Sequence, residues 1–122
     1  MSLEAALSAH LEQLAEHGGG EGVRDVGLLE SAMDRPRNRA AYAEPDAAEL
    51  AASYAFGLAR NHPFVDGNKR TALVVSLLFL AKNKLRLRAS DAETLAMFLD
   101  LAAGEVTEDE LSGWFRERIQ AA

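Results

Sequence analysis

A run of nine residues, His62–Arg70, holds the side chains of this sequence that are best suited to handle phosphate groups and protons. His62 is the one group in the run that accepts a proton near neutral pH. Asp66 is its only carboxylate, and beside a polyphosphate such a group is a natural ligand for Mg²⁺. Gly67 lets the backbone approach a ligand closely. The run therefore predicts a phosphate-binding site with a proton acceptor next to it.

The run also precedes a predicted helix, residues 69–82, which is the most hydrophobic helix of the chain. The start of a helix offers unpaired backbone N–H groups and the positive end of the helix dipole. Asn68 adds a side-chain amide there. Lys69 and Arg70 add positive charge, and the guanidinium of Arg70 can grip a phosphate through two hydrogen bonds. A proton acceptor, a metal-binding carboxylate and an anion cradle together predict phosphoryl or nucleotidyl transfer onto a hydroxyl group.

Phe64 lies between the polar groups of the run, and we expect its ring to anchor the loop in the core. A plain surface turn is the alternative, because each residue of the run fits a solvated loop when taken singly. The alternation of a large apolar residue with polar groups at the start of a helix favours a functional site.

The composition limits the other functions that the chain can have. The formal net charge is −6, which argues against electrostatic binding to nucleic acid or to an anionic membrane surface. The absence of cysteine excludes a disulfide scaffold, a thiolate metal site and a cysteine nucleophile, and three histidines leave little room for zinc. The N-terminus lacks the features of an export signal, and the longest apolar stretch, residues 72–81, is too short to span a membrane. We expect a cytoplasmic protein.

The composition also predicts the fold class. The sequence has 23 Ala and 18 Leu against 10 β-branched residues, which favours helices over strands. We therefore expect residues 1–122 to form a single all-α domain, a compact bundle of about six helices. The helix at residues 69–82 is apolar almost all round and is expected to be the buried central helix.

Start and stop signals predict where the other helices lie. The first helix carries one apolar face, made of Leu3, Leu7, Leu11 and Leu14, and the glycines at 18–20 end it. A short helix is expected at 26–33, because Pro36 follows it and breaks a helix. The next three helices begin at capping residues, namely Asp46, Ser90 and Thr107. Residues 85–87 read as a short extended piece without a predicted partner, and Ile119 is placed on the inner face of the last helix.

The run resembles the signature of the Fic/Doc family, and most closely that of its Doc branch of toxins. The Doc pattern is His-x-Phe-x-Asp-(Ala/Gly)-Asn-Lys-Arg-Thr-Ala, and this sequence matches it at His62, Phe64, Asp66, Gly67, Asn68, Lys69, Arg70, Thr71 and Ala72. The resemblance extends to the glycine-rich turn with Arg24-Asp25, to Leu77–Leu80 and to Ala102–Glu105, and it covers essentially the whole chain.

Two positions differ from the Fic branch. Lys69 stands where Fic proteins have a second glycine, and Leu73 where they have a second arginine. In Fic enzymes these positions shape the cradle for the outer phosphates, and AMP is transferred. Both departures match the Doc branch, whose members resemble Fic in fold but bind ATP in the reverse orientation and transfer its γ-phosphoryl group. The resemblance thus implies a protein kinase whose target is a threonine of elongation factor Tu, with arrested translation as the result.

The resemblance further implies a role for each residue and a set of partners. His62 would be the general base, Asp66 would hold Mg²⁺ or orient the reacting groups, and Gly67, Asn68, Lys69 and Arg70 would hold the phosphates of ATP. The chain would be the toxin of a type II toxin–antitoxin pair, inhibited by a Phd-like antitoxin whose C-terminal segment folds into a groove over the site. It would not bind DNA itself. The alternatives are a Fic-type AMP transferase, a binding module of the same fold without catalysis, and a helical domain without a ligand.

Overall fold

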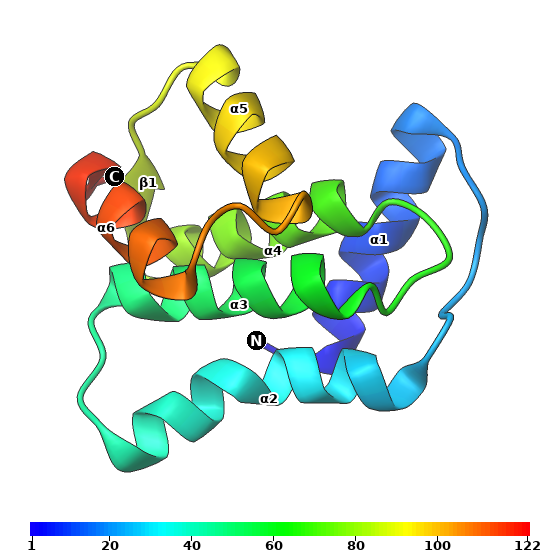
Figure 1. Cartoon of the computed structure of the whole chain (residues 1–122), viewed down its shortest axis with the longest axis horizontal. Coiled ribbons are helices and arrows are strands. Elements are labelled where there is room, and N and C mark those ends of the chain that lie inside the picture. The colour runs from blue at the N-terminus through cyan, green and yellow to red at the C-terminus, as the bar shows by residue number, and fades with distance from the viewer.

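The computed structural model describes residues 1–122, which form six helices and one small sheet (Figure 1). The helices are α1 (Leu3–His17), α2 (Val26–Tyr42), α3 (Ala47–Asn61), α4 (Asn68–Lys82), α5 (Asp91–Ala102) and α6 (Glu108–Arg118). The two strands are β1 (Leu85–Leu87) and β2 (Ile119–Ala121). The prediction of a helical bundle with about six helices is confirmed. No helix is long and apolar enough to cross a membrane.

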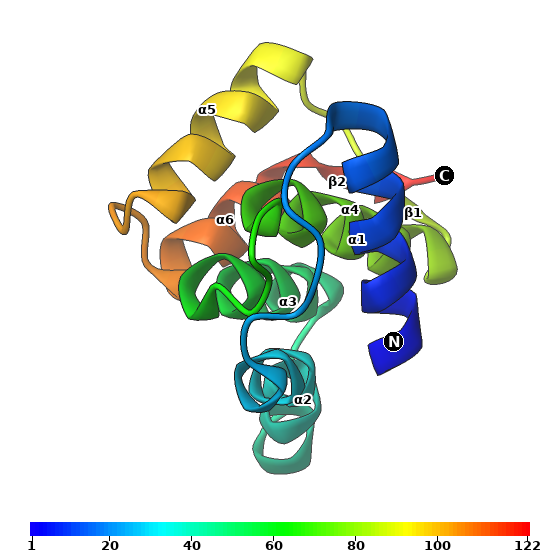
Figure 2. The same ribbon diagram turned by 90° about the vertical axis from the view of Figure 1, so that its right-hand side faces the viewer.

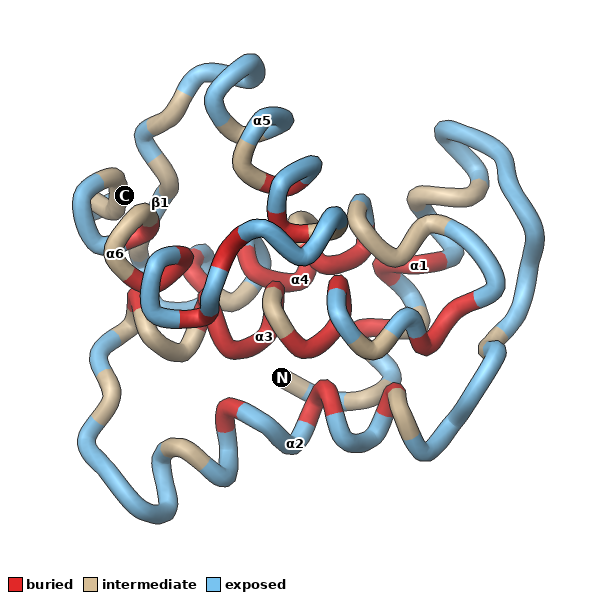
Figure 3. The backbone as a smooth tube through the Cα atoms, in the orientation of Figure 1, coloured by how far each residue is buried: buried red, intermediate tan, exposed pale blue.

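The most buried helix is α3, not α4 as the sequence predicted. Figures 1 and 2 show α3 between α2 on one side and α4 and α6 on the other, and Figure 3 shows it buried over most of its length. The reason is the small size of its side chains, because α3 is rich in alanine and contains Gly57, so its neighbours can approach closely. A Cβ added to Gly57 would lie 3.2 Å from the Cα of Ala32 in α2. By contrast, α4 leaves Leu77 and Leu78 exposed.

Helix α2 does not stop before Pro36 but continues through it to Tyr42, so the predicted break is wrong. A proline inside a helix removes one backbone hydrogen bond, which costs about 3 kcal/mol. Two contacts offset this loss. Pro36 itself is buried, and Arg35 and Arg39 on either side of it both form ion pairs with Glu108 of α6. Tertiary contacts therefore decide the length of this helix.

A chain of ion pairs links the ends of α2, α3 and α6. Arg39 also pairs with Glu49, and Arg116 of α6 donates from Nε to the Oδ2 of Asp46 at 2.8 Å. Asp46 is the N-cap of α3 and forms the predicted capping box with Glu49. The hydrogen bond from Arg116, with the backbone N–H of Glu49, lowers the pKa of Asp46 below its ordinary value of 3.8.

Replacing Asp46 by asparagine should lower the free energy of unfolding by about 0.5 kcal/mol at pH 7, since a half-exposed pair contributes little. Asparagine caps a helix as well as aspartate does, so the variant keeps the helix cap and removes the ion pair with Arg116. A group with a lowered pKa stabilises the fold above its unfolded pKa, and this contribution is lost as the pH falls through the folded one. Urea unfolding of both proteins should therefore show a difference that shrinks below a pH of 3.8. A difference that stays constant with pH would contradict this assignment.

The extended piece at residues 85–87 does have a partner. It pairs antiparallel with the last residues of the chain, with Leu85 opposite Ala121 and Leu87 opposite Ile119. Helix α6 ends at Arg118 for the same reason, so Ile119 belongs to a strand and not to the inner face of a helix.

The face that α1 buries also differs from the predicted one. Its buried residues are Ala6, Ala9 and His10, whereas Leu11 is 60% exposed. Small side chains bring α1 close to its neighbours, and the flanking leucines cover the edges of the contact. His10 is a packed histidine, and it contacts the loop that carries the predicted site.

Candidate functional site

The loop between α3 and α4 lines a cavity of about 370 Å³ at the surface of the molecule. All six predicted site residues lie on its wall. The lining residues are His62, Val65, Asp66, Gly67, Asn68, Lys69 and Arg70. One small hollow therefore gathers the histidine, the carboxylate, both cations and the start of α4.

His62 lies at the C-terminal end of α3, where its backbone is in the left-handed region at φ 49° and ψ 54°. Arg24, from the segment before α2, holds this turn from outside. Its guanidinium donates from Nε to the carbonyl of His62 at 2.8 Å and from a terminal nitrogen to the carbonyl of Asn61 at 3.0 Å. The backbone N–H of Arg24 also donates to the carbonyl of Pro63, at 2.7 Å. These bonds fix the His62 backbone, while its side chain stays exposed at the cavity.

Phe64 anchors the loop, as its position in the run predicted. Its side chain is 1% exposed and its ring stacks on that of His10, with centroids 3.8 Å apart. Asn68 closes the loop over this anchor, because its Oδ1 accepts from the N–H of Phe64 at 2.9 Å and its Nδ2 donates to the carbonyl of Phe64 at 3.0 Å. The amide of Asn68 is thus largely engaged within the loop. Its backbone N–H and one side-chain N–H remain for a ligand.

The carboxylate of Asp66 is exposed, and one of its oxygens, Oδ1, accepts the N–H of Gly67 at 2.8 Å. The other oxygen has no partner within the chain and faces Gly19, where an added Cβ would lie 2.7 Å from Oδ2. No group of three or more histidine, aspartate or glutamate side chains that could hold a metal occurs in the structure. Mg²⁺ is nevertheless compatible with a single carboxylate, because it commonly takes its other ligands from phosphates and water.

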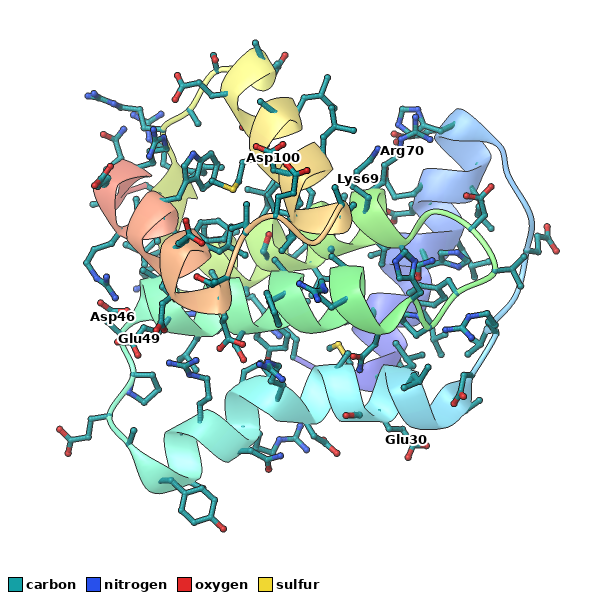
Figure 4. The ribbon with its side chains drawn as sticks, in the orientation of Figure 1. Glu30, Asp46, Glu49, Lys69, Arg70 and Asp100 are labelled. Carbon is teal, nitrogen blue, oxygen red and sulfur yellow. The ribbon has the colours of Figure 1, made fainter.

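The N-terminus of α4 differs from those of the other five helices. A side chain caps each of the others, from Ser2, Asp25, Asp46, Ser90 or Thr107, whereas the N-cap residue of α4 is Gly67, which offers no side-chain cap. Lys69 and Arg70 in this first turn form no ion pair with a carboxylate of the chain. Figure 4 shows both at the N-terminal end of α4, close to α1 and α5. Free N–H groups, a helix dipole and two unpaired cations are the features that can bind an anion.

A second hollow, of about 510 Å³, adjoins the first and shares Lys69 and Arg70 with it. It runs between α1, α4 and α5, and we call it the α5 groove. Its apolar wall consists of Leu73, Val74, Leu95 and Phe98. Leu73, at the position that separates the Fic and Doc patterns, thus faces this groove.

Three residues outside the run also shape the site, although no role at this site was predicted for them: His10, Gly19 and Arg24. Each lies at least 37 residues from its contact in the loop. The resemblance of the glycine-rich turn with Arg24-Asp25 to the family pattern is the one sequence signal for this segment.

Comparison with known proteins agrees with the motif. Residues 1–80 match the model of the Fic/DOC family, a range that includes the whole loop. The chain is similar to "Protein kinase doc" of Escherichia phage P1, with 34% identity over 123 residues that cover 100% of this chain and 97% of the relative. It is also similar to "Toxin Doc" of Mycolicibacterium smegmatis, with 45% identity over 74 residues that cover 59% of this chain and 57% of the relative.

Proposed function

This chain belongs to the Fic/Doc family and to its Doc branch, and we propose that it is a toxin kinase that transfers the γ-phosphoryl group of ATP to a threonine of elongation factor Tu. That it is a Doc-type toxin follows from its relatives. The observation that carries the chemistry is the shared cavity, in which His62 and Asp66 lie beside an uncapped helix start with two unpaired cations.

In the proposed reaction, His62 is the general base. A neutral ring nitrogen takes the proton of the threonine hydroxyl as its oxygen forms a bond to the γ-phosphorus. The bond from that phosphorus to the bridging oxygen breaks, and ADP leaves with the electron pair. Lys69, Arg70 and the N–H groups after Gly67 hold the phosphate oxygens on which negative charge gathers. Positioning and charge stabilisation supply most of the rate enhancement.

Asp66 is the residue that would hold Mg²⁺. Its carboxylate is exposed and its Oδ2 has no partner in the chain, so this oxygen would be free to bind the ion. When bound, Mg²⁺ supplies positive charge to the phosphate groups.

Lys69 and Leu73 favour phosphoryl over adenylyl transfer. A lysine at position 69 adds a long side chain beside the cavity, where the Fic pattern has glycine. Leucine at position 73 offers no charge to a third phosphate and instead lines the apolar α5 groove. Transfer of AMP, the main alternative, needs the cradle that these two positions have lost.

Growth and translation in cells test this function. Expression of the protein should arrest growth, and elongation factor Tu isolated from arrested cells should carry phosphothreonine. The His62→Ala variant should give neither result. Continued arrest by His62→Ala would instead support the alternative of a binding module that acts without catalysis.

We propose that the α5 groove receives the C-terminal segment of a Phd-like antitoxin. The groove is apolar on one wall and ends at Lys69 and Arg70, so a segment with apolar and acidic residues would fill it and cover the cations. Leu95 of the groove is 56% exposed in the free chain, as expected of a surface that a partner covers.

Replacing Leu95 by arginine should weaken antitoxin binding at least about tenfold, because it puts a charge into an apolar contact. Phosphoryl transfer by the free toxin should stay unchanged, since Leu95 lies outside the loop cavity. Leu78→Arg is the matched control, at a leucine of similar exposure that does not line the groove. Titration calorimetry with the antitoxin segment measures the effect. Equal affinity of the Leu95→Arg variant and the wild type would place the antitoxin elsewhere.

Gly19 gives a sharper test of the role of Asp66. A methyl group at Gly19 would lie 2.7 Å from Oδ2 of Asp66 and must push this carboxylate aside. Gly19→Ala should therefore lower the transfer rate about 10²-fold, the effect typical of a displacement near 1 Å. Gly18→Ala is the control, because Gly18 also has a positive φ but no atom within 4 Å of an added Cβ. Both variants should lose about 1 to 3 kcal/mol of stability from backbone strain. Equal rates in the two folded variants would contradict a positioned Asp66.

A further inference from the structure

His10 of α1 is a buried titratable residue that the proposed reaction does not use. It is 2% exposed, and it lies 56 residues before the loop that it contacts. Its ring stacks on Phe64 with an interplanar angle of 7°. Its Nε2 lies 2.7 Å from the carbonyl oxygen of Asp66. A carbonyl oxygen can only accept, so Nε2 carries the hydrogen and donates it.

The hydrogen bond from His10 fixes the whole peptide unit between Asp66 and Gly67, and not only its carbonyl group. The C=O of Asp66 and the N–H of Gly67 belong to the same planar peptide unit, so a bond that holds the first also sets the direction of the second. That N–H donates to Oδ1 of Asp66 at 2.8 Å. The orientation of the Asp66 carboxylate is therefore connected to His10 through two hydrogen bonds and one rigid plane.

Packing reinforces this connection. The ring of His10 lies against the start of α4, where a Cβ added to Gly67 would be 3.6 Å from its Cδ2. No other donor within the chain reaches the Asp66 carbonyl. An apolar residue at position 10 would fill the same space but would leave that carbonyl unpaired.

We infer that His10 is a positioning residue, which donates from Nε2 to the Asp66 carbonyl and so aims the Asp66 carboxylate and the first N–H groups of α4 into the loop cavity. The chemistry that it serves rests on the proposed function. The geometric part of the inference, a peptide plane held by His10, does not depend on which phosphate is transferred.

Two substitutions separate the effect of the hydrogen-bond donor of His10 from the effect of its packing. His10→Gln keeps an N–H at a similar distance along the side chain, whereas His10→Leu keeps only apolar volume, and both lose the ring. Under conditions in which both variants are fully folded, His10→Leu should lower kcat about tenfold to a hundredfold. It should also raise the Mg²⁺ concentration for half-maximal activity, and His10→Gln should restore most of both losses. Glu12→Gln, at an exposed site on the same helix, should behave as the wild type.

Amide hydrogen exchange at Gly67 is a readout that needs no activity. Exchange should be faster in His10→Leu and close to wild type in His10→Gln. The inference is overturned if the two variants match each other in exchange and in kcat, since the ring or the volume would then be what matters. Failure of the proposed function looks different. The His62→Ala variant would then keep the activity of the wild type, while His10→Leu and His10→Gln would still differ in amide exchange at Gly67.

Discussion

Replacing His62 by alanine is expected to lower the rate of phosphoryl transfer by about 10²- to 10⁴-fold, the usual contribution of a general base. His62 is the only histidine that lines the loop cavity, and its side chain is exposed to an incoming hydroxyl group. The rate is measured with purified protein, elongation factor Tu, Mg²⁺ and labelled ATP. Binding of ATP should change little, because the phosphate contacts come from Lys69, Arg70 and the start of α4.

The backbone of His62 makes a matched control necessary. Its left-handed conformation, at φ 49°, costs about 1 to 2 kcal/mol for most residues, so His62→Ala loses stability as well as the base. Asparagine tolerates this conformation and accepts no proton near neutral pH. We expect His62→Asn to be more stable than His62→Ala and just as inactive. If the His62→Asn variant were active, a group other than His62 would have to accept the proton of the threonine hydroxyl.

Replacing Phe64 by alanine is expected to lower the free energy of unfolding by about 3 to 5 kcal/mol, because it empties a fully buried aromatic site. A loss of this size is a large fraction of the stability of a small domain. The rate per folded molecule should fall too. The ring of Phe64 stacks on His10, and the backbone N–H and C=O of Phe64 form the two hydrogen bonds with the side chain of Asn68. Denaturant unfolding and the transfer assay measure the two effects.

Phe115→Ala is the control for this variant. Phe115 of α6 is as buried as Phe64, with 0% exposure, but it does not line the loop cavity. Both variants should lose similar stability, and only Phe64→Ala should lose rate per folded molecule. A loss of rate in both would mean that the site responds to general stability and not to the anchoring of its loop.

The candidate site could be predicted from the sequence because its parts are local. His62 to Arg70 are contiguous, and a helix start must follow the loop, so their order alone brings histidine, carboxylate and cations to one end of α4. The helix starts at Asp46 and Thr107 were predictable for the same reason, since a capping box spans only four positions.

Contacts between distant segments were not predictable in the same way. The pairing of Leu85 with Ala121, the passage of α2 through Pro36 and the burial of α3 each depend on which elements meet in space. Hydrophobicity pointed to α4 as the centre, but small side chains let α3 take that place. His10, Gly19 and Arg24 reach the loop for the same reason, from helices and turns that precede it by dozens of residues.

Parallel reactions with ATP labelled at the α or the γ phosphate test most directly whether this loop performs kinase chemistry. Each contains the purified protein, elongation factor Tu and Mg²⁺, and each is repeated with His62→Ala. The geometry around Lys69 and Leu73 predicts that label passes to the factor from the γ position only, that ADP is released, and that the variant transfers none. Label transferred from the α position would show AMP transfer and would contradict the assignment of this site as a kinase.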